Sequence, residues 1–260
     1  MNAAMRAAGF GPRDRAVIIH ADDLGMNGST VPAFEDLLEA GVVTSGSVMT
    51  PCPWFPAMAE LCRGRKDLDI GVHITLTSEW RGYRWRPLTG STPETGLVDD
   101  AGFFHATRAM ATERACPEAA YREMKAQVEA ARKSGIQVTH MDSHMFTSVQ
   151  PRLLSAYRKV AEEERLPCFV PGDGQDNPKP LMLDADTAEG CAAQVKMLAG
   201  GLEPGLYHLL IHPAKDTPEL REIVPAWRRR VAEYECFLDR GLRNHLENAG
   251  IALIGYGALA

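Results

Sequence analysis

The sequence has no surplus of positive charge and no long hydrophobic run. Its 260 residues carry 28 Lys and Arg against 34 Asp and Glu, for a formal net charge of −6. This balance gives no electrostatic case for binding nucleic acid or an anionic membrane surface. No stretch of about 18 apolar residues occurs, so a membrane-spanning helix is not expected. These absences argue against a nucleic-acid-binding protein and against a protein embedded in a membrane.

Paired cysteine motifs and a secretory signal are also missing. The six cysteines are widely spread and contain no Cys-X-X-Cys pair, and the N-terminal stretch MNAAMRAAGFGPRDR lacks an apolar core. Both features are typical of reduced thiols in a cytoplasmic protein. No repeat or linker divides the chain. We therefore expect a flexible N-terminal tail over residues 1–14 and one domain over residues 15–260.

What is present is an ordinary globular composition, with 45% hydrophobic residues, in which strand and helix patterns alternate. This alternation predicts a parallel sheet with right-handed crossovers. About seven strands in roughly 250 residues fit either a distorted barrel or an open doubly wound sheet. The expected strands are 16–20, 44–49, 68–77, 138–142, 168–170, 207–212 and 251–256, and the expected helices are 28–40, 54–65, 117–134, 151–164, 187–199 and 227–248.

Aspartate and histidine gather where four of the expected strands end. The first strand leads into ADDLG, the third reads IGVHITLT, the fourth reads VTHMDSH and the sixth reads YHLLIHPA. In parallel α/β folds, ligands bind beyond the carboxyl ends of the strands. Four strands that deliver Asp or His to one end therefore predict a functional site there.

The ADDLG and GVH motifs each allow two interpretations. Asp22 and Asp23 suit an N-cap or a turn, but two adjacent carboxylates in a closed site repel each other unless a cation compensates them. A divalent metal would compensate one and leave the other as a base. His73 is either a hydrogen-bonded core histidine or a metal ligand, because neutral imidazole commonly binds divalent metals.

The fourth and sixth strands raise the same alternatives. His140, Asp142 and His144 stand at every second position and would share one face of a strand. They form either a polar cluster or a ligand supported by Asp142, and the spacing does not say which histidine binds. His212, before Pro213, is either a capped strand end or a general acid or base. Together these residues are the equipment of metal-assisted hydrolysis.

The motifs HADDLG, TSGSVM, IGVHITLT, THMDSH and IHPA, in this order, closely resemble the YdjC-like carbohydrate deacetylase family. That family includes chitooligosaccharide deacetylases and hopanoid-biosynthesis-associated relatives, and the resemblance covers residues 15–256. It implies a distorted TIM-like (β/α) barrel related to polysaccharide deacetylases. It also implies a hydrolase of linear amide bonds that removes acetyl groups from N-acetylated amino sugars or oligosaccharides.

The resemblance implies a role for each candidate residue. Two imidazoles and one carboxylate suit Zn²⁺, Fe²⁺, Co²⁺ or Mn²⁺, and the family points to one Mg²⁺ or Zn²⁺ ion. The implied metal ligands are Asp23, His73 and His144, the base is Asp22, the acid is His212, and His140 and Asp142 support the metal or face the substrate.

Two segments depart from this simple picture. Relatives commonly continue the fourth motif with further histidines, where this chain has Met145, Phe146 and Thr147. The difference bears on the substrate more than on the metal. The stretch SEWRGYRWRPL carries three aromatic and three arginine residues, and it either lines a glycan cleft or packs over the mouth of the barrel. Its aromatic residues are Trp80, Tyr83 and Trp85.

Three alternatives stay open. The first is a metallohydrolase that acts on a non-sugar amide. The second is a metallohydrolase that acts on a phosphoester, and the arginines of residues 81–86 are consistent with it. The third is a non-catalytic sugar- or metal-binding protein on the same fold. Other features have plain interpretations. The WRRR run at residues 227–230 is expected to be a solvated helix face, and His105 and His245 are expected at the surface. A homodimer is expected only because twofold dimers are the commonest oligomers.

Overall fold

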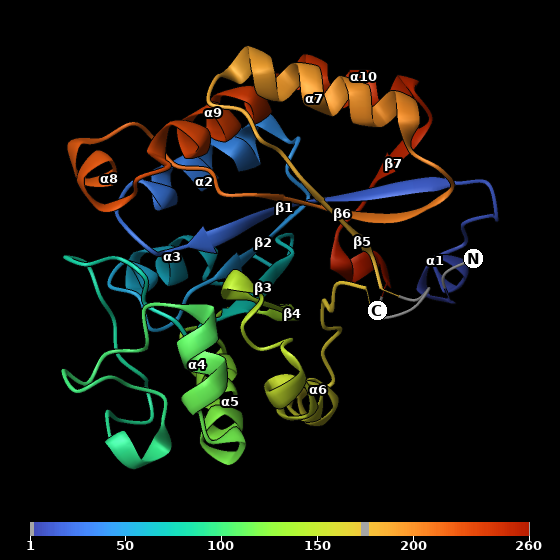
Figure 1. Ribbon diagram of the computed structural model, residues 1–260. Coiled ribbons are helices and arrows are strands. Elements are labelled where there is room, and N and C mark those ends of the chain that lie inside the picture. The colour runs from blue at the N-terminus through green and yellow to red at the C-terminus, as the bar shows by residue number, and fades with distance from the viewer. Residues whose placement is uncertain (1–2, 173–176, 260) are drawn as a thin grey trace. The chain divides into compact units, whose positions relative to one another are not determined.

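The computed structural model describes residues 3–172 and 177–259, and strands alternate with helices along them (Figure 1). The strands are β1 (Arg15–Leu24), β2 (Ser45–Val48), β3 (Ile70–Ile74), β4 (Val138–Ser143), β5 (Lys179–Met182), β6 (Gly205–Ile211) and β7 (Ile251–Leu253). They form a seven-stranded sheet in the order β4-β3-β2-β1-β6-β5, and β7 pairs with β1. The expected parallel α/β architecture with seven strands is confirmed, as a sheet rather than as a closed barrel.

The helices begin and end at residues that suit those positions. Pro117 and Pro151 occupy the first turns of two long helices, where a missing backbone N–H costs nothing. Gly41 ends another helix with φ of 73°, and its N–H donates to the carbonyl of Leu37. The α-helices are α1 (Ala3–Ala7), α2 (Thr30–Ala40), α3 (Phe55–Cys62), α4 (Arg108–Arg114), α5 (Pro117–Lys133), α6 (Pro151–Glu164), α7 (Ala188–Gly201), α8 (Pro218–Ile223), α9 (Trp227–Phe237) and α10 (Arg240–Asn248), and the 3₁₀ helices are η1 (Pro93–Thr95), η2 (His144–Phe146) and η3 (Tyr256–Leu259).

The chain divides into two compact units. The first comprises Met1–Leu24, Gly28–Gly46 and Val170–Ala260, and the second comprises Gly25–Asn27 and Ser47–Phe169. The first unit therefore contains the ends of β1 and β6, whereas the second contains β3 and β4. Of the candidate residues, the first unit holds Asp22, Asp23 and His212, and the second holds His73, His140, Asp142 and His144.

In the first unit, β1 pairs in parallel with β6, and Ile18 lies opposite His208. β1 is buried along nearly its whole length, which explains its continuous apolar run, because a parallel strand is covered on both faces. Figure 1 shows α2, α7 and α9 on one side of β1 and β6. The shared register brings the carboxyl ends of both strands, and the polar residues on them, to one edge.

In the second unit, β3 and β4 pair in parallel, and their register places His73 opposite Asp142. Helix α5 packs against α6 and against β3, and α5 and α6 lie side by side in Figure 1. The histidine of one motif and the aspartate of another are thus neighbours because of strand pairing, although 69 positions separate them in the sequence.

Three expected elements differ from the structure. Residues 168–170 form only a single bridge, between Cys168 and Met141, because Pro167 and Pro171 flank them and proline donates no ladder hydrogen bond. The last helix is interrupted before α10, where the side chain of Asp239 caps a new start. Part of the expected N-terminal tail is the short helix α1, in which Met5 is buried; residues 1–2 lie outside the described residues.

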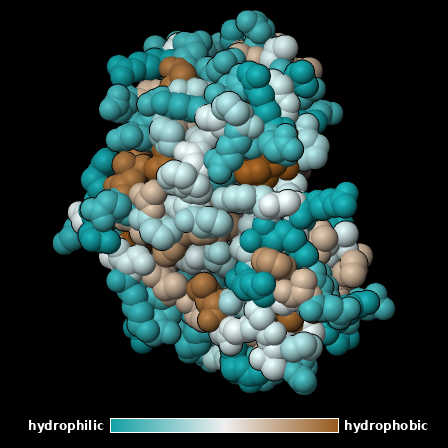
Figure 2. Space-filling model, turned by 90° about the vertical axis from the view of Figure 1, so that its left-hand side faces the viewer, coloured by the Kyte–Doolittle hydropathy of each residue, from teal (hydrophilic) through white to brown (hydrophobic). Residues whose placement is uncertain are grey.

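The surface carries no extended apolar band on the face shown in Figure 2, where hydrophilic residues cover most of the area and hydrophobic residues form separate patches. Within residues 3–172 and 177–259, no helix is long and apolar enough to cross a membrane. All six cysteines are free, as expected for reduced thiols. Single exposed hydrophobic side chains are common on protein surfaces, so they do not by themselves indicate a binding site.

Candidate active site

Asp23, at the end of β1, has a strained backbone and a charged partner. Its φ is 59°, in the left-handed region that non-glycine residues rarely adopt and that is often found at functional sites. Its side chain is buried, and its Oδ2 accepts a hydrogen bond of 2.6 Å from Nη2 of Arg230. A buried carboxylate needs such a partner. Arg230 is therefore not part of a solvated face, as the WRRR run was expected to be, because α9 directs it to the end of β1.

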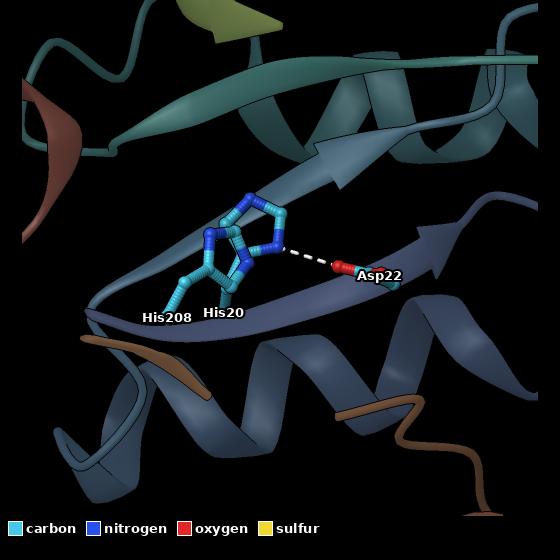
Figure 3. Close-up of side chains that lie close together, drawn as sticks. All are labelled: His20, Asp22 and His208. Carbon is cyan, nitrogen blue, oxygen red and sulfur yellow. Dashed lines mark hydrogen bonds and ion pairs between the residues drawn. The ribbon is translucent and has the colours of Figure 1, made fainter. Parts of the chain in front are cut away.

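Asp22 is held between two histidines in the same unit. Its Oδ1 accepts a hydrogen bond of 2.6 Å from Nδ1 of His20, which Figure 3 shows as a dashed line. Its Oδ2 lies 3.9 Å from Nε2 of His212, too far for a direct hydrogen bond. Asp22 and His212 are thus neighbours whose facing atoms are not paired with each other.

His212 is arranged to carry a proton. Its backbone N–H donates to Oε2 of Glu233 at 2.6 Å, and the same oxygen lies 3.7 Å from its Nδ1. Burial lowers the pKa of His212, but the hydrogen bond and charge of Glu233, with the charge of Asp23, outweigh burial and the nearby Arg230. The pKa of His212 is therefore raised above its ordinary value. An imidazolium at the end of β6 suits a general acid.

In the second unit, both site histidines are paired with carboxylates. Nδ1 of His73 donates to Oδ2 of Asp142 at 2.8 Å, and the hydroxyl of Ser47 donates to the same oxygen at 3.0 Å. Nε2 of His144 lies 3.1 Å from Oε1 of Glu79. Because a carboxylate only accepts, each contact places a ring proton on the nitrogen that faces it.

The other two ring nitrogens face each other. Nε2 of His73 and Nδ1 of His144 are 3.3 Å apart, and in neutral imidazoles held as described both are acceptors. Two acceptor nitrogens at this separation are able to bind one cation together. Two nitrogens bound at about 2.0–2.1 Å to one tetrahedral ion lie about 3.3–3.4 Å apart. The donor set of His73 and His144, each oriented by a carboxylate, therefore fits a divalent metal.

The three alternating residues of VTHMDSH have different surroundings. His140 is fully buried and lies near the side chains of Thr139 and Asp69. Asp142 orients His73, as above. The strand ends before His144, which opens η2, and there Met145 and Phe146 have φ values of 52° and 54°. This irregular turn, rather than strand alternation, sets the direction of His144.

The aromatic segment after β3 forms two layers. Trp85 is buried, donates its indole N–H to the carbonyl of Thr77 at 2.8 Å and lies 6.4 Å from the ring of His144. Trp80 and Tyr83 are half-buried and contact Trp85 edge to face. Trp85 thus supports the site from within, and the other two offer partly exposed ring surface.

Sequence reasoning named Asp142 as a supporting carboxylate but missed the other partners of the site residues. Glu79 follows β3 after an irregular stretch, so strand periodicity does not connect it to His144. Glu233 and Arg230 lie on a helix more than 200 positions from Asp23. His105, expected at the surface, is buried, with Nε2 donating to the carbonyl of Gly96, and burial lowers its pKa. Only spatial neighbourhood identifies such residues.

Comparison with known proteins decides the family. The model of the YdjC-like protein family matches residues 16–248. The chain belongs to the YdjC-like family. Among relatives of this member, the carbohydrate deacetylase of Thermus thermophilus is 36% identical over 87% of each chain. The carbohydrate deacetylase of Vibrio cholerae serotype O1 is also 36% identical, over 94% of this chain and 96% of its own.

Solved structures support the fold of this YdjC-like protein. A proposed cellobiose-phosphate cleavage protein from Enterococcus faecalis V583 superposes with a TM-score of 0.81 at 26% identity, over 95% of this chain and 99% of its own. The peptidoglycan deacetylase PdaC from Bacillus subtilis gives a TM-score of 0.50 at 11% identity, over 96% of this chain and 92% of its own. At that identity the second match bears on the fold alone.

Proposed function

We propose that this YdjC-like protein is a metal-dependent carbohydrate deacetylase that removes acetyl groups from N-acetylated amino sugars or oligosaccharides. Curated relatives that match most of the chain carry the name carbohydrate deacetylase. The observation that carries the metal dependence is the pair of ring nitrogens of His73 and His144, 3.3 Å apart, each on an imidazole oriented by a carboxylate.

The proposed ligands are Asp23, His73 and His144. Asp23 joins the two histidines in this proposal because it ends β1 and occupies the ligand position of the ADD motif. Two imidazoles and a carboxylate favour Zn²⁺ over Mg²⁺. A divalent ion held by these residues would polarise the acetamide carbonyl and lower the pKa of water.

The proposed acid–base pair is Asp22 and His212. Oδ2 of Asp22, which faces His212, takes the proton of the attacking water. Nε2 of His212 gives its proton to the departing amine, which leaves acetate and a free amino sugar. The raised pKa of His212 keeps that proton available near neutral pH. General acid–base assistance of this kind contributes about 10²–10⁴-fold.

We also propose that Trp80 and Tyr83 stack on a sugar ring, while Trp85 supports the nearby His144. The half-buried rings of Trp80 and Tyr83 lean on Trp85 and present apolar faces of the kind that carbohydrates bind. The exposed Met145 lies in the stretch where the family resemblance implies further histidines, and this stretch contributes to substrate choice. A cytoplasmic location and a homodimer stay predictions.

A phosphoester substrate is the second candidate, because the structural relative from Enterococcus faecalis is named for a phosphorylated disaccharide. Two of the three arginines of the aromatic segment, Arg84 and Arg86, speak against it. Arg84 is bound to Asp99 at 2.6 Å, and Arg86 lies over the ring of Phe103 at 3.9 Å and donates to the carbonyl of Ala101. Both are used to hold the segment rather than to bind phosphate.

A substrate panel tests the proposal. The metal-stripped protein is reloaded separately with Zn²⁺, Mg²⁺, Mn²⁺ and Co²⁺ and is given N-acetylglucosamine oligomers, an N-acetylglucosamine conjugate, a non-sugar acetamide and a phosphorylated disaccharide. We expect acetate release from an N-acetylated sugar with at least one metal and none after chelation. Phosphate release alone, or metal binding without turnover of any substrate, would contradict the proposal.

A further inference from the structure

A buried aromatic group lies behind Asp22 in the first unit. His20 and Asp22 occupy alternate positions of β1 and therefore point to one face, and His208 lies on the neighbouring strand β6. The side chains of all three are at most 3% exposed. Figure 3 shows the two imidazoles side by side, with only His20 directed at the carboxylate. The site proposed above makes no use of His20 or His208.

The contacts in this group fix the ring of His20. Its centroid lies 4.5 Å from that of His208, and the ring of Tyr256 meets His20 edge-on at 6.1 Å. Tyr256, in η3, shares a hydrogen bond of 2.8 Å with Nδ1 of His208. His20 is thereby packed between neighbours that are themselves bonded, which restricts its rotation and aims its Nδ1 at Asp22.

The hydrogen bond to His20 gives the two carboxylate oxygens of Asp22 different surroundings. Oδ1 accepts from Nδ1 of His20 at 2.6 Å, a short charge-assisted bond in a buried position. Oδ2 is thereby turned toward His212, 3.9 Å away, at the partly exposed end of β6. Without the bond, the carboxylate could rotate about its terminal torsion, which is broad and roughly twofold.

We propose that His20 is a positioning residue that orients Asp22 for proton transfer, with His208 and Tyr256 as the packing that fixes His20. The inference rests on the proposed function, in which Asp22 is the base. His20, Asp22 and His208 also have the residue types of a metal site. The 2.6 Å bond, however, joins two of their ligand atoms directly and leaves no room for an ion between them.

Kinetics of matched variants test the role of His20. His20→Leu removes the donor, His20→Asn keeps an amide N–H near the position of Nδ1, and Tyr256→Phe removes a hydroxyl from the same buried group without touching Asp22. Loss of a supporting partner typically costs about 10–100-fold in activity. We expect His20→Leu to lower kcat by that factor with little change in KM, and His20→Asn to recover most of it. Tyr256→Phe keeps the ring that packs edge-on against His20 and the bond from His20 to Asp22, so it should lower kcat much less than His20→Leu does.

Spectroscopy gives a readout that needs no substrate. In protein labelled with ¹⁵N-histidine, we expect a protected, far-downfield proton on Nδ1 of His20 that disappears in His20→Leu and moves upfield in Asp22→Asn. If the wild-type protein releases no acetate, the proposed function fails while this measurement still tests the contact. A different tautomer of His20, unchanged kcat in a folded His20→Leu variant, or the loss of one metal equivalent in that variant would each overturn the proposal.

Discussion

His73 and His144 owe their directions to two carboxylates, of which Asp142 belongs to the fourth motif and Glu79 belongs to none. Asp142 fixes the proton on Nδ1 of His73, and Glu79 fixes the proton on Nε2 of His144. The two nitrogens that face each other are therefore Nε2 of His73 and Nδ1 of His144. Partners of this kind set the tautomer and the basicity of a ligating imidazole, so they belong to the proposed site as much as the proposed ligands do.

Separate loss of metal and of turnover distinguishes ligand from base. His144→Ala removes a donor and should lower the bound metal measured by elemental analysis. Asp22→Asn keeps the proposed ligands and should retain the metal while turnover falls about 10²–10⁴-fold. His245→Ala, an exposed histidine on α10, is the matched control and should change neither quantity. Unchanged metal content in His144→Ala would remove that residue from the ligand set.

The fall of activity at alkaline pH should follow the loss of the proton from His212. The groups that face it are Glu233 and Arg230 on α9 and Asp22 and Asp23 on β1. Its raised pKa keeps the acid protonated above the ordinary range, and activity falls as the pH rises through that pKa. Glu233→Gln removes the largest stabilising charge but keeps an acceptor for the backbone, so this fall should move to lower pH.

The pH profile of kcat/KM and the NMR titration of the His212 ring measure this shift. Both should move in the same direction in Glu233→Gln. A profile identical to that of the wild-type protein would show that another group causes the fall at alkaline pH.

At the scale of elements, strand register and one irregular turn arrange the candidate site residues of the second unit. Parallel pairing of β3 with β4 sets His73 beside Asp142, and the turn of η2 directs His144. Gly71 on β3 makes room for His140, because the fully buried ring of His140 occupies the space that a side chain at position 71 would need.

Gly71→Ala should therefore be costly. Its Cβ would lie 2.7 Å from Cε1 of His140, and overpacking of this kind costs about 1–3 kcal/mol. Gly82→Ala, where nothing lies within 4 Å, is the control and should leave the melting temperature almost unchanged. In a His140→Ala background, Gly71→Ala should cost much less. Equal costs in the two backgrounds would show that the ring is not the obstacle.

At the scale of the whole molecule, the proposed ligands are residues 23, 73 and 144, which are far apart in the sequence. The unfolded chain therefore offers no metal site made of these three residues. An ion that binds the folded chain and not the unfolded one stabilises it by mass action, by about 2.7 kcal/mol at one hundred times Kd. For a chain of this size the corresponding rise in melting temperature is about 5–10 °C.

Calorimetry of chelated and metal-loaded protein measures that rise. The increment should persist in Asp22→Asn and shrink in His144→Ala. A melting temperature that does not respond to any divalent ion at saturating concentration would contradict a folded-state metal site.

Local patterns predicted most of the elements, because amphipathic periods, helix-opening prolines and a left-handed Gly41 act over a few residues. They failed where distant or flanking residues decided the outcome. Two prolines left residues 168–170 with a single bridge, and Asp239 divided the last helix. Arg230 looked like part of a solvated run, yet it is paired with Asp23.

The sequence by itself determined the family, the parallel α/β class and the chemistry-bearing residues at the strand ends, because motifs and hydrophobic periods are local and read directly. Only the tertiary structure decided which residue serves which. It gave Asp142 to His73 and Glu79 to His144, and it placed His20 against Asp22. These partnerships depend on strand register and on helix placement between residues far apart in the chain, and no local pattern encodes them.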